Sequence, residues 1–165
     1  MEIFPATIHD IDAIRTIAKN TWPNAYGKIL SGEQLEYMLD KMYSQESLAL
    51  QFSTGNVFIL AKNNQEIVGF ASWSLTDQKN GIYHLQKIYV LPSEQGKKTG
   101  SKLLNYILDD ILRKSGKYLR LNVNRDNVAR YFYEKLGFRI IEEVDIPIGN
   151  NYFMNDFIME KKLTQ

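Results

Sequence analysis

The stretch from residue 81 to residue 116 constrains the fold more than any other part of the chain. GIYHLQKIYVLP is typical of a strand, and the turn after it, SEQGKKTGS, contains Gly96 and Gly100. The next helix has an apolar stripe and is expected to end at Gly116; the stripe consists of Leu103, Leu104, Ile107, Leu108, Ile111 and Leu112. A strand, a glycine-containing turn and a helix bring free backbone N–H groups to the positive end of the helix dipole. This order predicts a site for an anion such as phosphate.

Hydrophobic periodicity predicts the remaining elements. MEIFPATI is typical of a short edge strand, because its proline cannot donate to a ladder. A helix is predicted over residues 9–20, with Pro23 and Gly27 breaking it. Ser31 and Gln34 form an S-x-x-Q capping box that opens a second helix. Further helices are predicted over residues 44–52 and 126–138, and strands over 56–62, 66–75, 118–124, 139–146 and 152–163. This order indicates a single α/β (α+β) domain over residues 1–165, built around a mixed sheet.

Composition and charge exclude several classes of protein. The chain has 165 residues and no cysteine, which rules out disulfides, thiolate metal sites and a cysteine nucleophile and fits a reducing cytoplasm. Its net charge is +1, without the basic excess typical of nucleic-acid binding. No apolar run approaches the ~20 residues that span a bilayer. His9, expected at the surface, and His84 are the only histidines, so no metal site is expected. The sequence indicates a cytoplasmic protein without nucleic-acid or membrane partners.

Three kinds of phosphate-binding turn compete for residues 92–104. A Walker A loop needs four residues between its glycines, whereas three separate Gly96 from Gly100, and Leu103 occupies the position of the magnesium ligand. The dinucleotide fingerprint fails because the stretch has no G-x-G. The third kind is a plain strand–turn–helix whose backbone amides converge on an anion, with Lys97 and Lys98 adding positive charge. The alternative is a surface loop with solvated lysines.

Two blocks of the sequence carry a resemblance to a known family. HLQKIYVLPSEQGKKTGSKLL resembles the acyl-CoA-binding core of the GNAT N-acetyltransferases, a strand L-x-x-[IL]-Y-V-x-P followed by [QR]-x-x-G-x-[GA] and a helix. Lys98 stands where many members have glycine. LNVNRDNVARYFYEKLGF resembles the next family motif, in which Asp126 or Asn127 would be the asparagine that contacts pantetheine. TWPNAYGKIL and the end of the chain look like the branch that includes polyamine acetyltransferases.

The resemblance implies a fold and a reaction. The fold is that of the acyl-CoA N-acyltransferases, a mixed and mostly antiparallel sheet of about seven strands with helices on both faces. The reaction is direct transfer of the acetyl group of acetyl-CoA, a co-substrate, to a primary amine. The pantetheine arm would pair with the strand edge at Ile88 and Val90, and the Ile88 amide would stabilise the oxyanion by ~3 kcal/mol. The implied coenzyme contacts are Ile88, Tyr89, Val90, Gln95, Gly96, Lys97, Lys98, Thr99, Gly100, Ser101, Asn124, Asn127 and Tyr133.

Two side chains are candidates for the proton transfers. The acceptor amine, with a pKa of ~10.4, must lose a proton before it attacks. His84 is the candidate base, because residues 84, 86 and 88 share one face of a regular strand; Gln86 would position a water. The alternatives to this role are a structural histidine and a chain of waters. Tyr133 matches the family tyrosine that protonates the leaving thiolate, and the alternative for it is aromatic packing.

The acceptor pocket of this fold lies between the first helices and the last strands. Aromatic rings and a carboxylate would suit a cationic small amine or a polyamine. The candidates are Trp22, Tyr26, Tyr37, Trp73, Tyr152 and Asp156. Two alternatives stay open, namely a protein N-terminus or lysine as acceptor, and a non-catalytic acyl-CoA sensor that would need neither His84 nor Tyr133. The resemblance also favours a homodimer.

Overall fold

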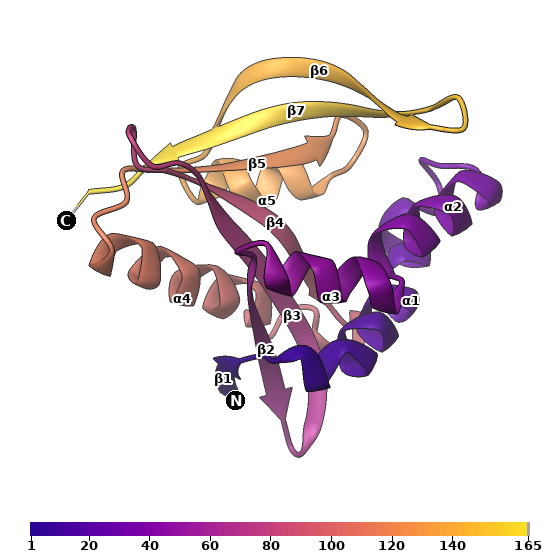
Figure 1. Cartoon of the computed structure of the whole chain (residues 1–165), viewed down its shortest axis with the longest axis horizontal. Coiled ribbons are helices and arrows are strands. Elements are labelled where there is room, and N and C mark those ends of the chain that lie inside the picture. The colour runs from indigo at the N-terminus through magenta and orange to yellow at the C-terminus, as the bar shows by residue number, and fades with distance from the viewer. Residues whose placement is uncertain (165) are drawn as a thin grey trace.

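The computed structural model of the chain describes residues 1–164. Seven strands form one sheet in the order β1-β2-β3-β4-β5-β7-β6 (Figure 1). The strands are β1 (Glu2–Pro5), β2 (Val57–Asn63), β3 (Glu66–Asp77), β4 (Ile82–Val90), β5 (Tyr118–Asn124), β6 (Arg139–Gly149) and β7 (Tyr152–Lys162). The helices are α1 (Ile11–Tyr26), α2 (Gly32–Tyr43), α3 (Gln45–Ser53), α4 (Thr99–Arg113) and α5 (Ala129–Lys135), with short 3₁₀ turns η1 (Ile8–Asp10) and η2 (Pro92–Glu94).

Neighbouring strands are antiparallel with one exception. β4 and β5 run parallel, because the chain crosses over through α4 between them. The pairs β1–β2, β2–β3, β3–β4, β5–β7 and β6–β7 are antiparallel. The predicted sheet, mixed and mostly antiparallel with seven strands, is therefore confirmed.

Alternating side chains divide the interior into two hydrophobic cores, one on each face of the sheet. In β2, Ile59 and Ala61 pack in the core with α4 and α5, whereas Phe58 and Leu60 pack in the core with α1, α2 and α3. The predicted stripe of α4 is buried at four of its six positions, Leu103, Leu104, Ile107 and Ile111. Helices thus cover both faces of the sheet, as predicted (Figure 1).

The prediction that Pro23 breaks the first helix is wrong. α1 continues through Pro23 to Tyr26, and Gly27 follows as its C-cap, donating its N–H to the Pro23 carbonyl. Proline in a helix interior removes one i to i−4 hydrogen bond. Trp22, which is 3% exposed, packs into the core immediately before the proline. We infer that this packing offsets the lost hydrogen bond, while Gly27 ends the helix as predicted.

Two predicted helix boundaries differ in detail from the structure. The Ser31 hydroxyl accepts a hydrogen bond from the Gln34 N–H, but the Gln34 side chain donates to the Phe153 carbonyl of β7, so the two residues form only half of a capping box. α4 ends at Arg113, and Ser115 takes the left-handed backbone conformation, with φ 61°. Gly116 then donates its N–H to the Ile111 carbonyl, so the predicted end of the helix is displaced by only a few residues.

Neither a membrane-spanning helix nor a cluster of metal ligands is found within residues 1–164. None of the helices in this range combines the length and the apolar character that crossing a membrane requires. Over the same range, no group of three or more His, Asp or Glu side chains is arranged to hold a metal ion.

Candidate functional site

β4 separates from β5 halfway along its length. The two strands pair only from Ile82 to Leu85, after which β5 continues without β4 as a neighbour. On the other side, Lys87 pairs with Ser72 and Leu85 pairs with Trp73, which leaves Gln86 without a partner in a β-bulge. A bulge bends its strand and increases its local twist. The bend accompanies the divergence of β4 from β5 that is visible in Figure 1.

The bulge also exchanges the faces of β4. Before it, Tyr83 and Leu85 pack in the core beneath α4; after it, Ile88 and Val90 pack against that same core. The residues of β4 that face this core therefore have odd numbers before the bulge and even numbers after it, because Gln86 is an extra residue. The expectation that residues 84, 86 and 88 share a face is therefore wrong. His84 lies on the α1–α3 face and Ile88 on the α4 face.

The amides of Ile88 and Val90 point into the gap beside β5. The Leu91 N–H donates to the carbonyl of Val68 in β3, at 2.8 Å, one position beyond the Val90–Gly69 pair. Hydrogen-bonded and non-hydrogen-bonded pairs alternate along an antiparallel ladder. The amides of Lys87 and Tyr89 therefore face β3, and those of Ile88 and Val90 face away from it. No β5 residue pairs with either of these two positions among residues 1–164.

The turn after β4 presents further free amides. Gly96 and Lys98 have positive φ, 80° and 62°, and the conformation at Lys98 explains why glycine is common there in the family. The Gln95 and Lys97 amides donate to carbonyls within the turn. Within the described chain no acceptor is recorded for the amides of Gly96, Lys98, Thr99, Gly100 and Ser101. The last three belong to the first turn of α4, whose dipole favours an anion at this end.

One of the two lysines of the turn is already paired. Glu94, which is buried, accepts from Lys97 Nζ at 3.1 Å and from the Thr99 hydroxyl at 3.1 Å. The hydrogen bond from Lys97 is the main cause that holds the pKa of Glu94 below its usual range. Glu94 thus neutralises Lys97 and ties η2 to α4. The exposed side chain of Lys98 has no acidic partner among residues 1–164, so it remains the cation of the turn.

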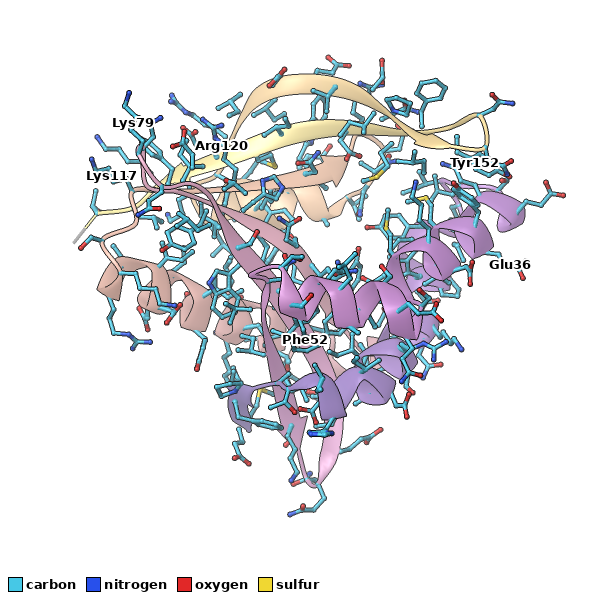
Figure 2. The ribbon with its side chains drawn as sticks, in the orientation of Figure 1. Glu36, Phe52, Lys79, Lys117, Arg120 and Tyr152 are labelled. Carbon is cyan, nitrogen blue, oxygen red and sulfur yellow. The ribbon has the colours of Figure 1, made fainter. Side chains whose placement is uncertain are left out.

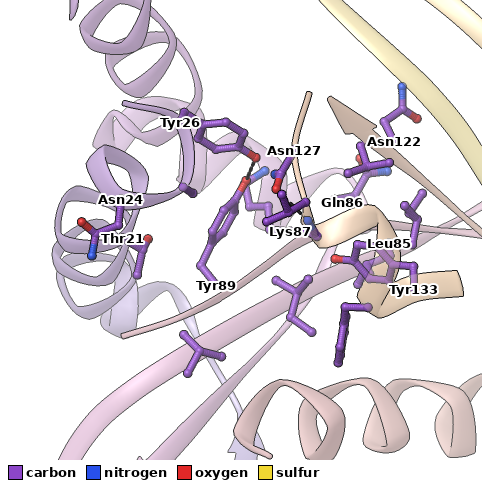
Figure 3. Close-up of a pocket in the computed structure, with 18 of the residues that line it drawn as sticks. Thr21, Asn24, Tyr26, Leu85, Gln86, Lys87, Tyr89, Asn122, Asn127 and Tyr133 are labelled. Atoms are coloured by element: carbon purple, nitrogen blue, oxygen red, sulfur yellow. Dashed lines mark hydrogen bonds between the residues drawn. The ribbon is translucent and has the colours of Figure 1, made fainter. Parts of the chain in front are cut away.

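A cavity of about 500 Å³ lies where β4 leaves β5 (Figure 3). We call it the splay cavity. Its walls come from β4, β5, α5 and the end of α1, and the predicted residues among them are Tyr26, Ile88, Tyr89, Val90, Gln95, Asn127 and Tyr133. Asn127 lines it while Asp126 is exposed, which favours Asn127 of the two candidates. Tyr133 is 8% exposed, and burial raises the pKa of its phenol, so the hydroxyl stays protonated.

A second cavity, of about 360 Å³, lies under α2 and beside β7. We call it the α2 cavity. It contains the predicted residues Trp22, Tyr26, His84 and Asp156, and also Asn124, which was expected to contact the coenzyme. The two cavities share a wall around the bulge, formed by Tyr26, Leu85, Gln86, Lys87, Tyr89 and Asn122. The Tyr26 and Tyr89 hydroxyls are 2.8 Å apart in this wall (Figure 3).

Two titratable groups of the α2 cavity, His84 and Asp156, have pKa values shifted in the direction that favours their neutral forms. Burial lowers the pKa of His84, with a hydrogen bond to Asn122 opposing the shift, so the imidazole is neutral near pH 7. Burial raises the pKa of Asp156, which is 2% exposed and accepts from Asn122 Nδ2 at 3.3 Å. Asn122 therefore links a neutral base to a buried carboxylate. Sequence reasoning missed Asn122, although it follows the same strand alternation as Asn124.

Three of the predicted acceptor residues lie elsewhere. Trp73 is 1% exposed and packs in the α4 core, with its ring 6.5 Å from that of Tyr106, so it lines neither cavity. Alternation along β3 explains this, because Ala71 and Trp73 face the α4 core while Phe70 faces the α1–α3 core. Tyr37 and Tyr152 pack on each other with their rings 5.3 Å apart, beyond the lining of the α2 cavity; Figure 2 shows Tyr152 near the outer end of α2.

Comparisons with known proteins agree on a family. Residues 28–149 match the model of the acetyltransferase (GNAT) domain. A spermidine N(1)-acetyltransferase of Thermoplasma acidophilum is 31% identical, covering 98% of this chain and 97% of its own. A ribosomal protein bS18-alanine N-acetyltransferase of Haemophilus influenzae is 36% identical over 57% of this chain and 58% of its own. The crystal structure of the PaiA N-acetyltransferase from T. acidophilum, in complex with coenzyme A, superposes with a TM-score of 0.84 at 27% identity, covering 98% of both chains.

Proposed function

The chain belongs to the GNAT family of acetyltransferases, and from that membership we propose that it transfers the acetyl group of acetyl-CoA to a primary amine, carried by a small molecule or a polyamine. The amine attacks the thioester directly while both substrates are bound. Acetyl-CoA is a co-substrate in this proposal, and none of the steps needs a metal ion.

The separation of β4 from β5 is the observation that carries this proposal. It opens a strand edge with the free amides of Ile88 and Val90, and that edge leads into the free amides at the start of α4. An amide-bearing arm that ends in a diphosphate has the right chemistry for both parts. The arm would pair with β4 in the way of an added strand, and the diphosphate would bind the turn, near Lys98.

The reaction requires two proton transfers, and each has a candidate group. A neutral amine attacks the thioester carbonyl, and the oxygen gains negative charge that the Ile88 amide would stabilise by ~3 kcal/mol. His84, or a water held near Gln86, would accept the proton that the amine loses. When the C–S bond breaks, the thiolate would take a proton or a hydrogen bond from Tyr133, whose hydroxyl lies in the splay cavity. The products are an amide and free coenzyme A.

The acceptor would occupy the α2 cavity, which meets the splay cavity at the bulge. Trp22, Tyr26 and Asp156 line it and would contact the amine end of the acceptor. The T. acidophilum relative is a spermidine acetyltransferase, which supports a small amine or polyamine as acceptor. The H. influenzae relative is an alanine N-acetyltransferase of a ribosomal protein, which keeps a protein N-terminus as the second candidate.

Thiol release tests the proposal directly. Purified protein is incubated with acetyl-CoA and a panel of primary amines, including spermidine and a short peptide with an N-terminal alanine, and free coenzyme A is quantified. We expect acceptor-dependent release, together with calorimetric binding of coenzyme A. Binding without turnover of any acceptor would favour the sensor alternative, and absence of binding would refute both.

Two further expectations accompany this function. The cysteine-free composition and the metabolic co-substrate support a cytoplasmic location. A homodimer is also expected by resemblance to the family, and sedimentation equilibrium of the purified chain measures its mass in solution.

A further inference from the structure

Lys87 occupies an unusual place in the wall of the α2 cavity. It follows the bulge in β4, and its side chain lies on the α1–α3 face. Its Nζ donates to Gln51 Oε1 of α3 at 2.7 Å and lies 5.5 Å from the centre of the Tyr43 ring at the end of α2. Tyr43 also lines the α2 cavity, so the ammonium group is at the acceptor side of the bulge.

Among residues 1–164, this ammonium group has no anionic partner, because no Asp or Glu oxygen lies within 4.0 Å of Lys87 Nζ. Burial lowers its pKa to about 8, so it is still mostly charged at pH 7. A buried charge is costly unless it is paired. An uncharged amide would join α3 to β4 by the same hydrogen bond, so a purely structural role leaves the charge unexplained.

A second donor in the same cavity has only a poorly aligned partner among residues 1–164. Trp22 is 3% exposed, and its Nε1 makes no well-formed hydrogen bond with any described residue. Burial raises the pKa of Tyr43, and the nearby Trp22 N–H opposes that rise, so the Tyr43 hydroxyl is the neighbour of this donor. Its ring lies edge-on to Tyr43 at 5.5 Å, so the indole and the ammonium group both pack against this ring. The half-buried ammonium group of Lys87 and the buried indole N–H of Trp22 therefore border the same space, and an anion in that space would pair with the first and accept a hydrogen bond from the second.

The rest of the cavity offers a single negative group. Asp156 is the one carboxylate among its lining residues, and His84 is neutral near pH 7. The lining therefore has one cation and one carboxylate. A polyamine carries two or more ammonium groups, of which the second would meet Lys87 without a partner of its own. A molecule with one amine and one anionic group matches both charges.

We propose that the acceptor is an amine that also carries an anionic group, and that Lys87 binds this group while the amine lies toward His84 and Asp156. The anion is a carboxylate or a phosphate, because both accept hydrogen bonds from an ammonium group and from an indole N–H. This inference rests on the proposed acetyl transfer and narrows its substrate class. It places such an acceptor ahead of spermidine.

Matched pairs of acceptors test the proposal. Butylamine is compared with 4-aminobutyrate, and ethanolamine with phosphoethanolamine, at pH 7 in the thiol-release assay, with spermidine beside them. For the wild type we expect kcat/KM at least tenfold higher for the anionic member of at least one pair, and higher than for spermidine. The pair that shows the preference tells carboxylate from phosphate.

Variants then assign the preference to Lys87. Lys87→Met keeps the length of the side chain and removes its charge, so the preference should fall to about onefold through a rise in KM for the anionic acceptor. The KM for acetyl-CoA should not change. Lys87→Arg should retain most of the preference. Lys19→Met, which removes an exposed lysine from α1, should behave as the wild type.

The outcomes separate this inference from the proposed function. Turnover of plain amines with no anionic preference, or a preference that survives Lys87→Met, overturns the inference and leaves the acetyltransferase intact. If no amine is acetylated, the proposed function fails. Calorimetry with 4-aminobutyrate and phosphoethanolamine on the coenzyme-loaded protein then decides whether the anion site exists. Binding that Lys87→Met weakens tenfold supports the site, and absence of binding refutes it. Melting temperatures of both variants show whether they remain folded.

Discussion

Tyr133 lines the splay cavity, and His84 lines the α2 cavity. Burial raises the pKa of Tyr133 and lowers the pKa of His84, and both shifts favour the neutral form. A phenol that stays protonated can donate a hydrogen bond to a developing thiolate, and an imidazole that stays unprotonated can accept a proton from an amine. Their positions in the two cavities are compatible with the proposed roles of Tyr133 at the leaving group and of His84 at the nucleophile.

Replacing Tyr133 by Phe should lower kcat about 100-fold and weaken coenzyme binding far less, because the ring still fills its place and only the proton donor is lost. Steady-state kinetics give kcat, and calorimetry gives the Kd of coenzyme A. Tyr131→Phe, on the exposed side of the same helix, is the matched control and should change neither. An unchanged kcat in Tyr133→Phe removes the phenol from the mechanism.

The pH dependence of kcat/KM should reveal His84. Because its pKa lies below 6.5 in the folded protein, the imidazole is active as a base above that pKa, and activity is lost as the pH falls through it. We expect an acid limb with a midpoint below pH 6.5 in the wild type and in His9→Gln. In His84→Gln that limb should disappear, and the activity should fall about 100-fold or more.

The lowered pKa of His84 also makes the folded chain less stable as the pH falls. The unfolded chain, with a histidine pKa of ~6.5, binds a proton that the folded chain excludes, so stability decreases as the pH falls below 6.5. Circular dichroism at each pH is therefore needed to separate protonation of the base from unfolding. A wild-type profile that keeps its full value well below pH 6.5 would speak against His84 as the base.

At the scale of elements, the bulge in β4 lies where the two cavities meet. A single unpaired residue, Gln86, accompanies the departure of β4 from β5 and places His84 and Ile88 on opposite faces. We expect that without it the strand would alternate regularly and continue to pair. The turn that follows, with Lys98 in a left-handed conformation, then directs α4 toward the same opening.

Deleting Gln86 should remove the bulge while leaving the flanking side chains on their present faces, because Leu85 and Lys87 then alternate as neighbours. We expect the protein to fold, and its affinity for coenzyme A to fall at least tenfold as the strands close. Gln86→Ala keeps the backbone bulge and loses only a hydrogen bond to Ser74, so its affinity should stay within about twofold of the wild type. Calorimetry and circular dichroism measure both. Full affinity in the deletion variant would show that the opening does not depend on the bulge.

At the scale of the whole molecule, one sheet supports two cores, and each core contains one of the two tryptophans. Trp22 reports on the α1–α3 face and Trp73 on the α4 face. If residues 1–165 form a single domain, neither face can unfold alone, because both cores share the same strands. Single-tryptophan variants, Trp22→Phe and Trp73→Phe, should therefore give coincident unfolding curves in urea.

Truncation in either core should destabilise both faces equally. Leu48 and Ile107, both 0% exposed, lie in different cores, and replacing each by Ala should lower the free energy of unfolding by about 2–5 kcal/mol. In each variant, both tryptophan probes should report the same loss. Separate transitions from the two tryptophans would instead show two cooperative units.

Much of the fold could be predicted because local patterns and pairing agree along most of the chain. The amphipathic stripe of α4, the two strands β2 and β3 and the glycine-containing turn were all predicted correctly. Pro23 was misinterpreted because a local rule against proline in helices was outweighed by the packing of Trp22. Lys87 was missed, although its place between Leu85 and Tyr89 in an apolar strand was a signal. Regular alternation would place Lys87 on the same face as Leu85 and Tyr89, so it gave no reason to expect a different environment for the lysine.

The sequence by itself determined the family, the order of the elements and the segment that presents free amides to an anion. These depend on residue types at short spacings, such as glycine in a turn and leucine every third or fourth position. Tertiary structure alone decided that His84 and Ile88 lie on opposite faces, that Trp73 belongs to the core and that Lys87 has no counter-ion within residues 1–164. The physical reason is that a bulge and a buried charge are defined by partners distant in the sequence, β3, α2 and α3, and no local pattern in β4 specifies them.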